Sequence, residues 1–259
     1  MLRSTLQRDQ WIILVCLVTV CAIAWWWLLD MSSRASTAGM DAMDMGGMDM
    51  TKMAMPAEPP LFATFLMWFV MMVAMMVPSA APMILIYERF AESTRKAGGA
   101  LMPTALFALL YLAVWAVFSL AATIAQILLS RAGLIDATSL AIGGRHIAGG
   151  LLIAAALYQL SPIKRSCLEN CRSPFSFLRR EWGPGWRAAA RLGIKHGIYC
   201  VGCCWLLMSL LFVGGVMNLA WVAILAVIIL VEKVAPLPHV TRVAAAGGAL
   251  FAGIYLLLF

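Results

Sequence analysis

The stretch from Pro103 to Leu129 reads PTALFALLYLAVWAVFSLAATIAQILL, and none of its 27 residues carries a charge. An apolar helix of about 20 residues is long enough to cross the roughly 30 Å hydrocarbon core of a bilayer. Comparable apolar runs lie on both sides of this stretch, so that 63% of the 259 residues are hydrophobic and 12% are charged. Because the runs are long and lack two-residue alternation, they predict an all-α fold, a transmembrane helical bundle that crosses the membrane several times.

About seven apolar runs are expected to form the helices of this bundle. They cover residues 11–29, 61–77, 103–129, 146–160, 194–213, 219–231 and 243–259. The first run is longer than the ~7–15 residues of a signal-peptide core, so residues 1–30 are predicted to form an uncleaved anchor. Residues 31–60 are predicted to be an external, flexible, helix-poor segment. Residues 61–259 are predicted to form a six-helix metal-binding domain with a basic cytoplasmic loop at 163–195.

The positive charge of the chain follows the loops between these runs. When the loops are placed on alternating sides, 15 of the 19 lysines and arginines fall on one side, which identifies that side as cytoplasmic. We therefore expect the N-terminus inside, the C-terminus outside and a multi-pass protein of the bacterial cytoplasmic (inner) membrane. This topology accounts for the net charge of +7 without a nucleic-acid partner, for which the sequence has no motif.

A thiol-rich stretch, KHGIYCVGCCW at residues 195–205, opens the fifth apolar run. On a helix, His196, Cys200 and Cys203 have the spacing i, i+4 and i+7 and share one face, and Cys204 lies at the edge of that face. Imidazole and thiolate suit Cu(I), Zn(II) or iron–sulfur chemistry far better than Mg or Ca. These four residues are therefore candidate metal ligands. The alternative is that intramembrane cysteines are only small packing residues.

Methionine is concentrated in the external segment, where residues 40–55 read MDAMDMGGMDMTKMAM. Thioethers prefer monovalent copper, and the interleaved aspartates would raise the local cation concentration. The candidate ligands in this segment are Met43, Met45, Met48 and Met50. We expect the segment to capture Cu(I), and the alternative is a disordered linker of biased composition.

A second set of methionines lies on the apolar run that follows. Met71 and Met75 are one helical turn apart and are candidate ligands, although such a stripe is often adaptable core packing. At ~1.5 Å per residue, Met75 of this helix and Cys203 of the fifth helix reach the same depth in the bilayer. Pro78 and Pro82 are expected to kink or break the helix and to free carbonyl groups there.

Cys167 and Cys171 form a Cys-x3-Cys pair in the predicted basic loop. One helical turn would bring both sulfurs to the same side, and neighbouring Lys164, Arg165 and Arg172 would favour the thiolate form. The pair is expected to bind the metal or to take part in thiol redox chemistry. The alternative is a pair of incidental cytosolic thiols.

Several of these motifs occur together in a known family. The run from Trp68 to Pro78, the segment from Tyr158 to Arg172, the stretch of residues 196–205 and the pair Glu232-Lys233 resemble a bacterial family of unknown function. Its members are described as predicted metal-binding integral membrane proteins, and some are labelled copper chaperones. The resemblance covers roughly residues 60–235 and implies a copper-binding membrane protein.

Three functions fit this sequence. The first is a non-enzymatic membrane protein that captures Cu(I), with zinc as the alternative metal, and relays or chaperones it across or within the inner membrane. Its partners would be the metal ion, the lipid bilayer and a copper donor or cuproenzyme; without an ATP-binding motif, active pumping is not indicated. The second is a membrane thiol–disulfide oxidoreductase that uses Cys200/Cys203 and Cys167/Cys171. The third is an assembly factor for a membrane cuproenzyme.

Overall fold

The computed structural model describes residues 2–44, 60–94, 101–136, 140–183 and 185–259. The regular structure of these residues is helical, apart from an isolated bridge between Ile135 and Ile142, which confirms the all-α prediction. The helices are α1 (Leu2–Asp44), α2 (Leu61–Thr94), α3 (Leu101–Arg131), α4 (Arg145–Leu160), α5 (Pro162–Arg172), α6 (Pro174–Glu181), α7 (Trp186–Ser209), α8 (Leu211–Gly214), α9 (Leu219–Val234) and α10 (Pro238–Leu258).

Five helical segments in the described residues are long and apolar enough to cross a membrane. They are Arg8–Arg34, Leu61–Ala91, Leu101–Arg131, Trp186–Gly214 and Pro238–Leu258. A sixth span results if α4 and α5 are counted together, although these helices meet at an angle of 63°. The structure therefore supports five or six spans rather than seven, because α9 has only 16 residues and a bilayer requires about 20.

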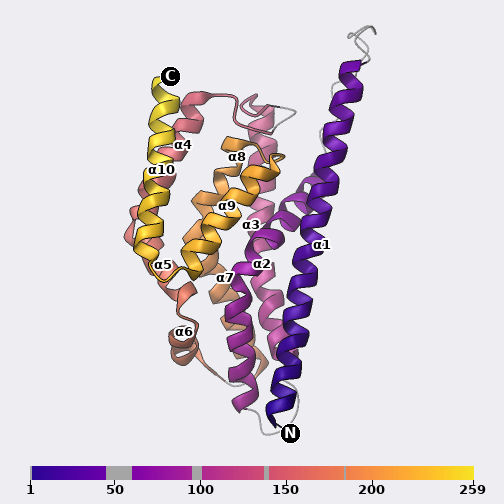
Figure 1. Ribbon diagram of the computed structural model, residues 1–259, viewed down its shortest axis with the longest axis vertical. Coiled ribbons are helices and arrows are strands. Elements are labelled where there is room, and N and C mark those ends of the chain that lie inside the picture. Colours follow the sequence, from indigo (N-terminus) through magenta and orange to yellow (C-terminus); the bar gives the residue numbers. More distant parts are fainter. Residues whose placement is uncertain (1, 45–59, 95–100, 137–139, 184) are drawn as a thin grey trace.

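Helix α1 lies along α2 at the edge of the molecule (Figure 1). Many of its apolar side chains are exposed, among them Trp11, Val18 and Trp26, with 60–64% of their surface accessible. In a bilayer these side chains face lipid, which explains why so apolar a helix needs few protein contacts.

The Met-rich segment is described only in part. Helix α1 continues to Asp44, so residues 31–44 are helical, whereas the sequence predicted a helix-poor segment from residue 31 onward. Met43 belongs to the last turn of this helix. The other three candidate ligands, Met45, Met48 and Met50, lie outside the described residues.

Helix α2 runs unbroken through Pro78 and Pro82. A proline lacks the N–H group that would bind the carbonyl four residues earlier, so Pro78 leaves the Ala74 carbonyl without its helical partner. The thiol of Cys21 in α1 donates to this oxygen across 3.6 Å. The helix is therefore not broken, but the predicted free carbonyl is present and connects α2 to α1.

The chain bends sharply between α4 and α5. Ser161 is extended, with φ −66° and ψ 149°, because the ring of Pro162 disfavours helical geometry in the residue before it. The Ser161 hydroxyl caps α5 by accepting a hydrogen bond from the Lys164 amide. Residues 163–195, predicted as a basic loop, therefore contain most of α5, all of α6 and the first turns of α7.

Glycines bring the central helices into close contact. On α7, a Cβ at Gly193 would collide with the Phe107 carbonyl of α3, and one at Gly197 would lie 2.8 Å from a valine side chain of α3. Between α4 and α10, a Cβ at Gly149 would lie 3.0 Å from the Gly253 carbonyl. Small residues let membrane helices approach in this way. Helix α3 is thus held close against α7, the helix that carries the three buried cysteines.

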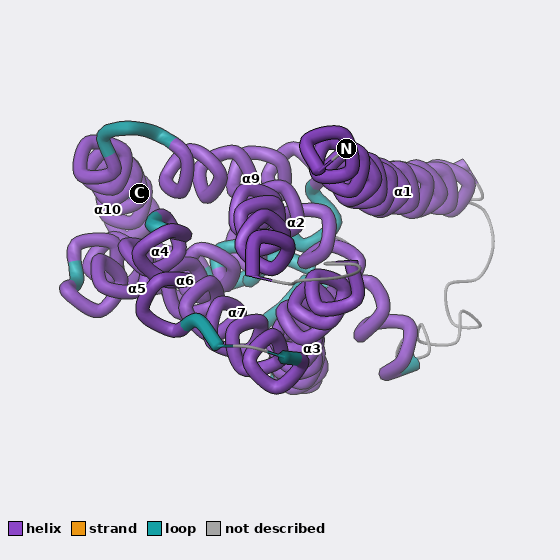
Figure 2. The backbone as a smooth tube through the Cα atoms, turned by 90° about the horizontal axis from the view of Figure 1, so that it is seen from below, coloured by secondary structure: helices purple, strands orange, loops and turns teal. Residues whose placement is uncertain are grey.

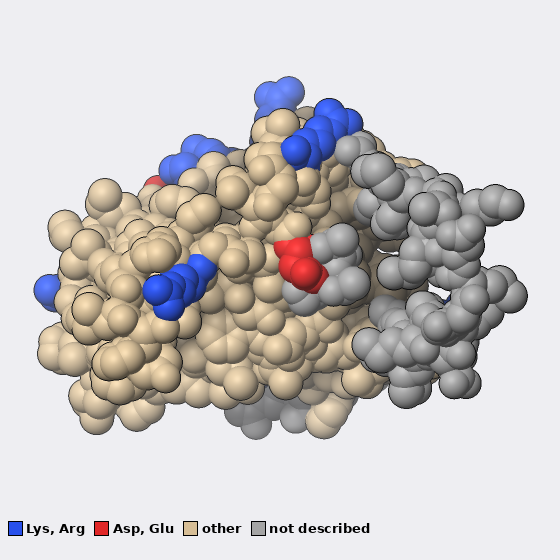
Figure 3. Space-filling model, turned by 90° about the horizontal axis from the view of Figure 1, so that it is seen from above, with Lys and Arg blue, Asp and Glu red and all other residues tan. Residues whose placement is uncertain are grey.

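The N-terminus and α6 lie toward one end of the molecule, and the C-terminus lies at the other (Figure 1). Viewed along the long axis, α1 and the α4–α10 pair are on opposite sides, with α2, α7 and α9 between them (Figure 2). Seen from the C-terminal end, the surface carries few charged side chains, scattered over mostly uncharged residues (Figure 3).

Candidate metal centre

Three cysteines of α7 point into the core of the bundle. Cys200, Cys203 and Cys204 are only 1–2% exposed. The thiols of Cys203 and Cys204 both donate to the Cys200 carbonyl, at 3.1 and 3.0 Å, as small polar side chains do toward the preceding turn of their own helix. The three sulfurs therefore lie close together in the interior, as their spacing on the helix predicts.

Cys200 is the centre of this group. Its sulfur lies 3.2 Å from the Tyr111 hydroxyl of α3 and accepts a hydrogen bond of 2.9 Å from the Lys233 ammonium of α9. The same ammonium donates to the Ser79 hydroxyl of α2 at 2.9 Å. Side chains from α2, α3, α7 and α9 thus converge around one buried thiol.

Two further sulfurs complete the arrangement. The thiol of Cys171 in α5 lies near those of Cys200 and Cys203. The thioether sulfur of Met76 in α2 lies 4.0 Å from the Cys204 thiol. We call Cys171, Cys200, Cys203, Cys204 and Met76 the sulfur cluster.

Cys167 lies beside the sulfur cluster, on the same helix as Cys171. Gly202 has no side chain, and a Cβ there would lie 2.9 Å from the Cys167 sulfur, so this thiol packs directly against the backbone of α7. Cys167 is half-buried, and all seven cysteines of the chain are free thiols. The Cys-x3-Cys pair therefore belongs to a helix that faces α7, and it is not part of a loop.

The cations near this pair do not face its thiols. Lys164 and Arg165 form ion pairs with glutamates, at 2.6 and 2.9 Å, and Arg172 donates to backbone carbonyls at the end of α9. The expectation that these three cations act on the thiols is therefore wrong. The ammonium that contacts a cluster thiol is that of Lys233.

His196 lies one turn before Cys200, outside the sulfur cluster. Its buried ring is surrounded by aromatic side chains, with the ring centroids of Phe107, Tyr111 and Phe177 at 5.9, 5.5 and 6.0 Å. Its Nδ1 atom is buried and has no hydrogen-bond partner among the described residues. The predicted helical face is correct, but α3 and α6 place aromatic rings around the imidazole.

In the part of the chain that the structure describes, no group of three or more histidine, cysteine, aspartate or glutamate side chains is arranged to hold a metal ion. A preformed site of His196 with Cys200 and Cys203 is therefore not present. Two cysteine thiolates of the sulfur cluster together with the Met76 thioether form a donor set that contains no histidine. Soft donors of this kind select Cu(I). The residues of the sulfur cluster thus fit a soft monovalent ion better than zinc.

The methionines of α2 differ in what they contact. Met71 and Met75 are 1% and 2% exposed and belong to the hydrophobic core. The contact with α7 is made by Met76, which meets Cys204. Helices α2 and α7 therefore do meet at their sulfur-bearing positions, although each contact residue is one position later than in the predicted pair, Met75 and Cys203.

Sequence reasoning assigned no role at the site to Tyr111, Ser79 or Met76, and it named Lys233 only as part of the pair Glu232-Lys233. One signal points to Lys233 nevertheless, since a charged residue at the end of an apolar helix is costly to bury unless it has a partner. Lys233 is 9% exposed, and the preceding Glu232 is 2% exposed. The three uncharged residues carry no comparable signal.

The comparison with known families agrees with this geometry. Residues 65–257 match the PpoB2 family model, which is described as copper chaperone. The match covers about three quarters of the chain and includes the whole sulfur cluster and Lys233, which confirms the family resemblance predicted from the motifs. No curated protein and no solved structure matches the chain. The chain therefore belongs to the PpoB2 copper chaperone family.

Proposed function

We propose that this protein is an integral membrane chaperone for Cu(I) that holds the ion at the sulfur cluster and passes it on. The observation that carries the proposal is the convergence on Cys200, whose sulfur contacts Tyr111 and Lys233 and whose carbonyl accepts from the Cys203 and Cys204 thiols. The family description supports copper as the metal. Copper is the cargo in this proposal, and no enzymatic reaction is required.

The donor atoms of the sulfur cluster suit this cargo. Thiolates and thioethers are soft ligands, and Cu(I) accepts a low coordination number, so a pair of thiolates with Met76 is sufficient. Two thiolates and one Cu(I) carry a net negative charge, which is costly in a buried site unless a cation offsets it. The Lys233 ammonium, 2.9 Å from the Cys200 sulfur, is placed to offset it.

The route of the ion is inferred from the residues around the cluster. The Met-rich segment, with Met43, Met45, Met48 and Met50, captures Cu(I) outside the membrane. Met71 and Met75 precede Met76 on α2 and lead toward the cluster. Half-buried Cys167 and the Nδ1 atom of His196 are further donors beside it.

The destination of the ion is a cytoplasmic carrier or a membrane cuproenzyme, reached from the bacterial inner membrane. This direction rests on the excess of lysine and arginine in the loops predicted to be cytoplasmic, which would place the N-terminus and α6 inside. An assembly factor for a cuproenzyme is one form of the same function, distinguished by its recipient.

The copper content of the purified full-length protein tests the proposal. Wild type prepared under reducing, copper-replete conditions should retain copper, as measured by mass spectrometry, and Cys200→Ser should lose most of it. The matched control is Cys16→Ser, which makes the same change at an exposed thiol of α1 and should keep the metal. A metal-free wild type, or equal copper in wild type and Cys200→Ser, contradicts the proposal.

A second experiment separates capture from storage. Deletion of residues 40–55 should slow copper uptake at low external copper, while the amount of copper held after loading at high concentration should stay the same. If the deletion also removes the stored copper, the Met-rich segment is the binding site and the sulfur cluster is not.

A thiol–disulfide relay is the second candidate function, and the proximity of Cys171 to Cys200 and Cys203 favours it. In this reaction two thiols form one disulfide and give two electrons and two protons to a disulfide substrate. Alkylation of the free thiols followed by mass spectrometry distinguishes the two functions. Reversible oxidation of Cys171 together with Cys200 or Cys203 in a copper-free protein supports the relay.

A further inference from the structure

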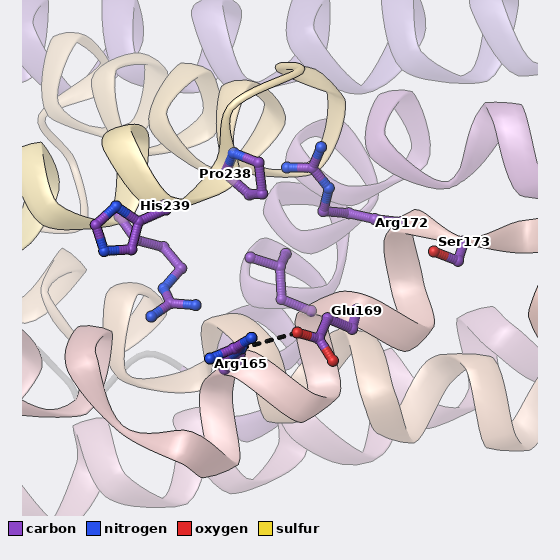
Figure 4. Close-up of a pocket in the computed structure, with 8 residues that line it drawn as sticks. Arg165, Glu169, Arg172, Ser173, Pro238 and His239 are labelled. Atoms are coloured by element: carbon purple, nitrogen blue, oxygen red, sulfur yellow. Dashed lines mark hydrogen bonds and ion pairs between the residues drawn. The ribbon is translucent and has the colours of Figure 1, made fainter.

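A cavity of about 350 Å³ lies between α5 and the start of α10. Its walls are formed by Arg165, Leu168, Glu169, Arg172, Ser173, Pro238, His239 and Arg242. Figure 4 shows Arg165 and Glu169 on one side of this cavity and Pro238 and His239 on the other. The sulfur cluster contributes none of these residues, so the copper proposal does not explain the cavity.

The lining of the cavity is strongly basic. Three arginines face one glutamate, which gives a formal net charge of +2. Glu169 is the ion-pair partner of Arg165, at 2.9 Å. Neither Arg172 nor Arg242 has a carboxylate partner among the described residues, and both donate to backbone carbonyls. The cavity therefore has two guanidinium groups whose charge the described residues do not balance.

Arg242 makes this imbalance significant because it is only 8% exposed. Its Nε atom donates to the Gln159 carbonyl at 3.2 Å, which leaves both terminal amino groups for a ligand. A buried charge without a counter-charge is costly, so an anion in the cavity would stabilise it. The planar guanidinium suits phosphate in particular, because it can donate two parallel hydrogen bonds.

The surroundings of the cavity indicate where such a phosphate comes from. Four large apolar side chains on or beside the helices that line the cavity are exposed, namely Ile163, Val234, Leu237 and Val240, with 57–65% of their surface accessible. They flank the ends of α5, α9 and α10, on segments that are expected to border lipid. A basic cavity beside an apolar rim matches the shape of a phospholipid, with a charged headgroup and acyl chains. Basic pockets between membrane helices are known to bind anionic headgroups.

We propose that this cavity binds the phosphate headgroup of an anionic phospholipid. Arg242 holds the phosphate, the positive charges of Arg165 and Arg172 in the same lining add to the attraction, and the acyl chains lie against the exposed apolar side chains of the rim. The bound lipid would connect α5, which carries Cys167 and Cys171, to α10. This site is independent of the metal and would exist in a copper-free protein.

Lipid retention by the delipidated full-length protein in detergent tests the proposal. Native mass spectrometry and the thermal unfolding midpoint are measured after addition of phosphatidylglycerol, phosphatidylcholine or inorganic phosphate. Wild type should retain phosphatidylglycerol selectively, and Arg242→Gln should weaken this binding by about tenfold, since a charge-assisted hydrogen bond is lost. Arg179→Gln is the control, because it removes the same charge from an exposed position of α6 outside the cavity.

A second variant guards against misfolding of the first. Arg165 is exposed, so Arg165→Gln should fold normally and should still weaken phosphatidylglycerol binding relative to Arg179→Gln. Three results would overturn the proposal. They are equal retention of phosphatidylcholine, full protection by inorganic phosphate alone, and equal lipid binding by Arg165→Gln and Arg179→Gln.

Discussion

Two buried lysines in this molecule have different partners. Lys164 of α5 is fully buried and donates to the Glu232 carboxylate at 2.6 Å, and Gln159 donates to the other oxygen of that carboxylate at 2.7 Å. Lys233 is the next residue after Glu232, yet it contacts a thiol and a hydroxyl. The Glu232 carboxylate is negatively charged with or without a metal ion. The Cys200 thiol becomes negatively charged when it binds a soft metal ion as a thiolate. The comparison indicates that Lys164 stabilises the fold and that Lys233 serves the sulfur cluster.

The largest effect on stability is expected from Glu232→Gln. This change leaves the Lys164 ammonium buried without a counter-charge, and breaking a buried ion pair costs about 3–5 kcal/mol of unfolding free energy. Denaturant unfolding of the detergent-solubilised protein measures the loss. The control is Glu169→Gln, which breaks the exposed pair with Arg165 and should cost no more than about 1 kcal/mol. Similar stabilities of the two variants would contradict the assigned role of Lys164.

Lys233→Met should affect copper binding more than stability. It removes the hydrogen bonds to Cys200 and Ser79, which are worth about 1–3 kcal/mol, so the stability loss is smaller than for Glu232→Gln. Copper affinity, measured by competition with a Cu(I) chelator, should fall by about tenfold or more, because the charge on the thiolates is no longer offset. If the variant binds Cu(I) as wild type does, Lys233 has only a structural role.

Tyr111→Phe tests the uncharged contact of the same thiol. The hydroxyl lies 3.2 Å from the Cys200 sulfur and 3.4 Å from the Met76 carbonyl. Its removal should cost about 0.5–1.5 kcal/mol of stability and should change copper affinity less than Lys233→Met does. A larger effect on affinity than that of Lys233→Met would identify the hydroxyl, and not the ammonium, as the main contact of the thiolate.

The smallest effect is expected at the partly exposed pair of Glu181 and Lys195, 2.6 Å apart. The hydrogen bond from Lys195 lowers the pKa of the Glu181 carboxyl. The resulting stabilisation is therefore fully present above the unfolded-state pKa of about 4.3 and is lost as the pH falls through the lower folded-state pKa. Solvent screening limits it to about 1 kcal/mol. The stability difference between wild type and Glu181→Gln, measured as a function of pH, should shrink on acidification; a difference that stays constant would contradict the assignment.

Much of the fold is readable from the apolar runs. Helical structure, membrane-spanning length and the ends of α4 are correctly predicted, because lipid requires backbone hydrogen bonds within each segment. The bend at Ser161 also follows from local chemistry, since Pro162 acts on the residue before it. Helices α5 and α6 and the start of α7, within residues 163–195, are harder to predict, because their polar and basic residues resemble those of a loop until they pack against other helices.

The sequence alone determined that the chain is a helical membrane protein and that three cysteines share one region of α7. The tertiary structure decided which partners those cysteines have. The close approach of α3 through Gly193 and Gly197 surrounds His196 with aromatic rings and places Tyr111 beside Cys200. The way α2 and α9 pack against α7 places Met76 beside Cys204 and Lys233 beside Cys200. Helical periodicity specifies the neighbours within one helix, but the neighbours across an interface depend on how all the helices pack together.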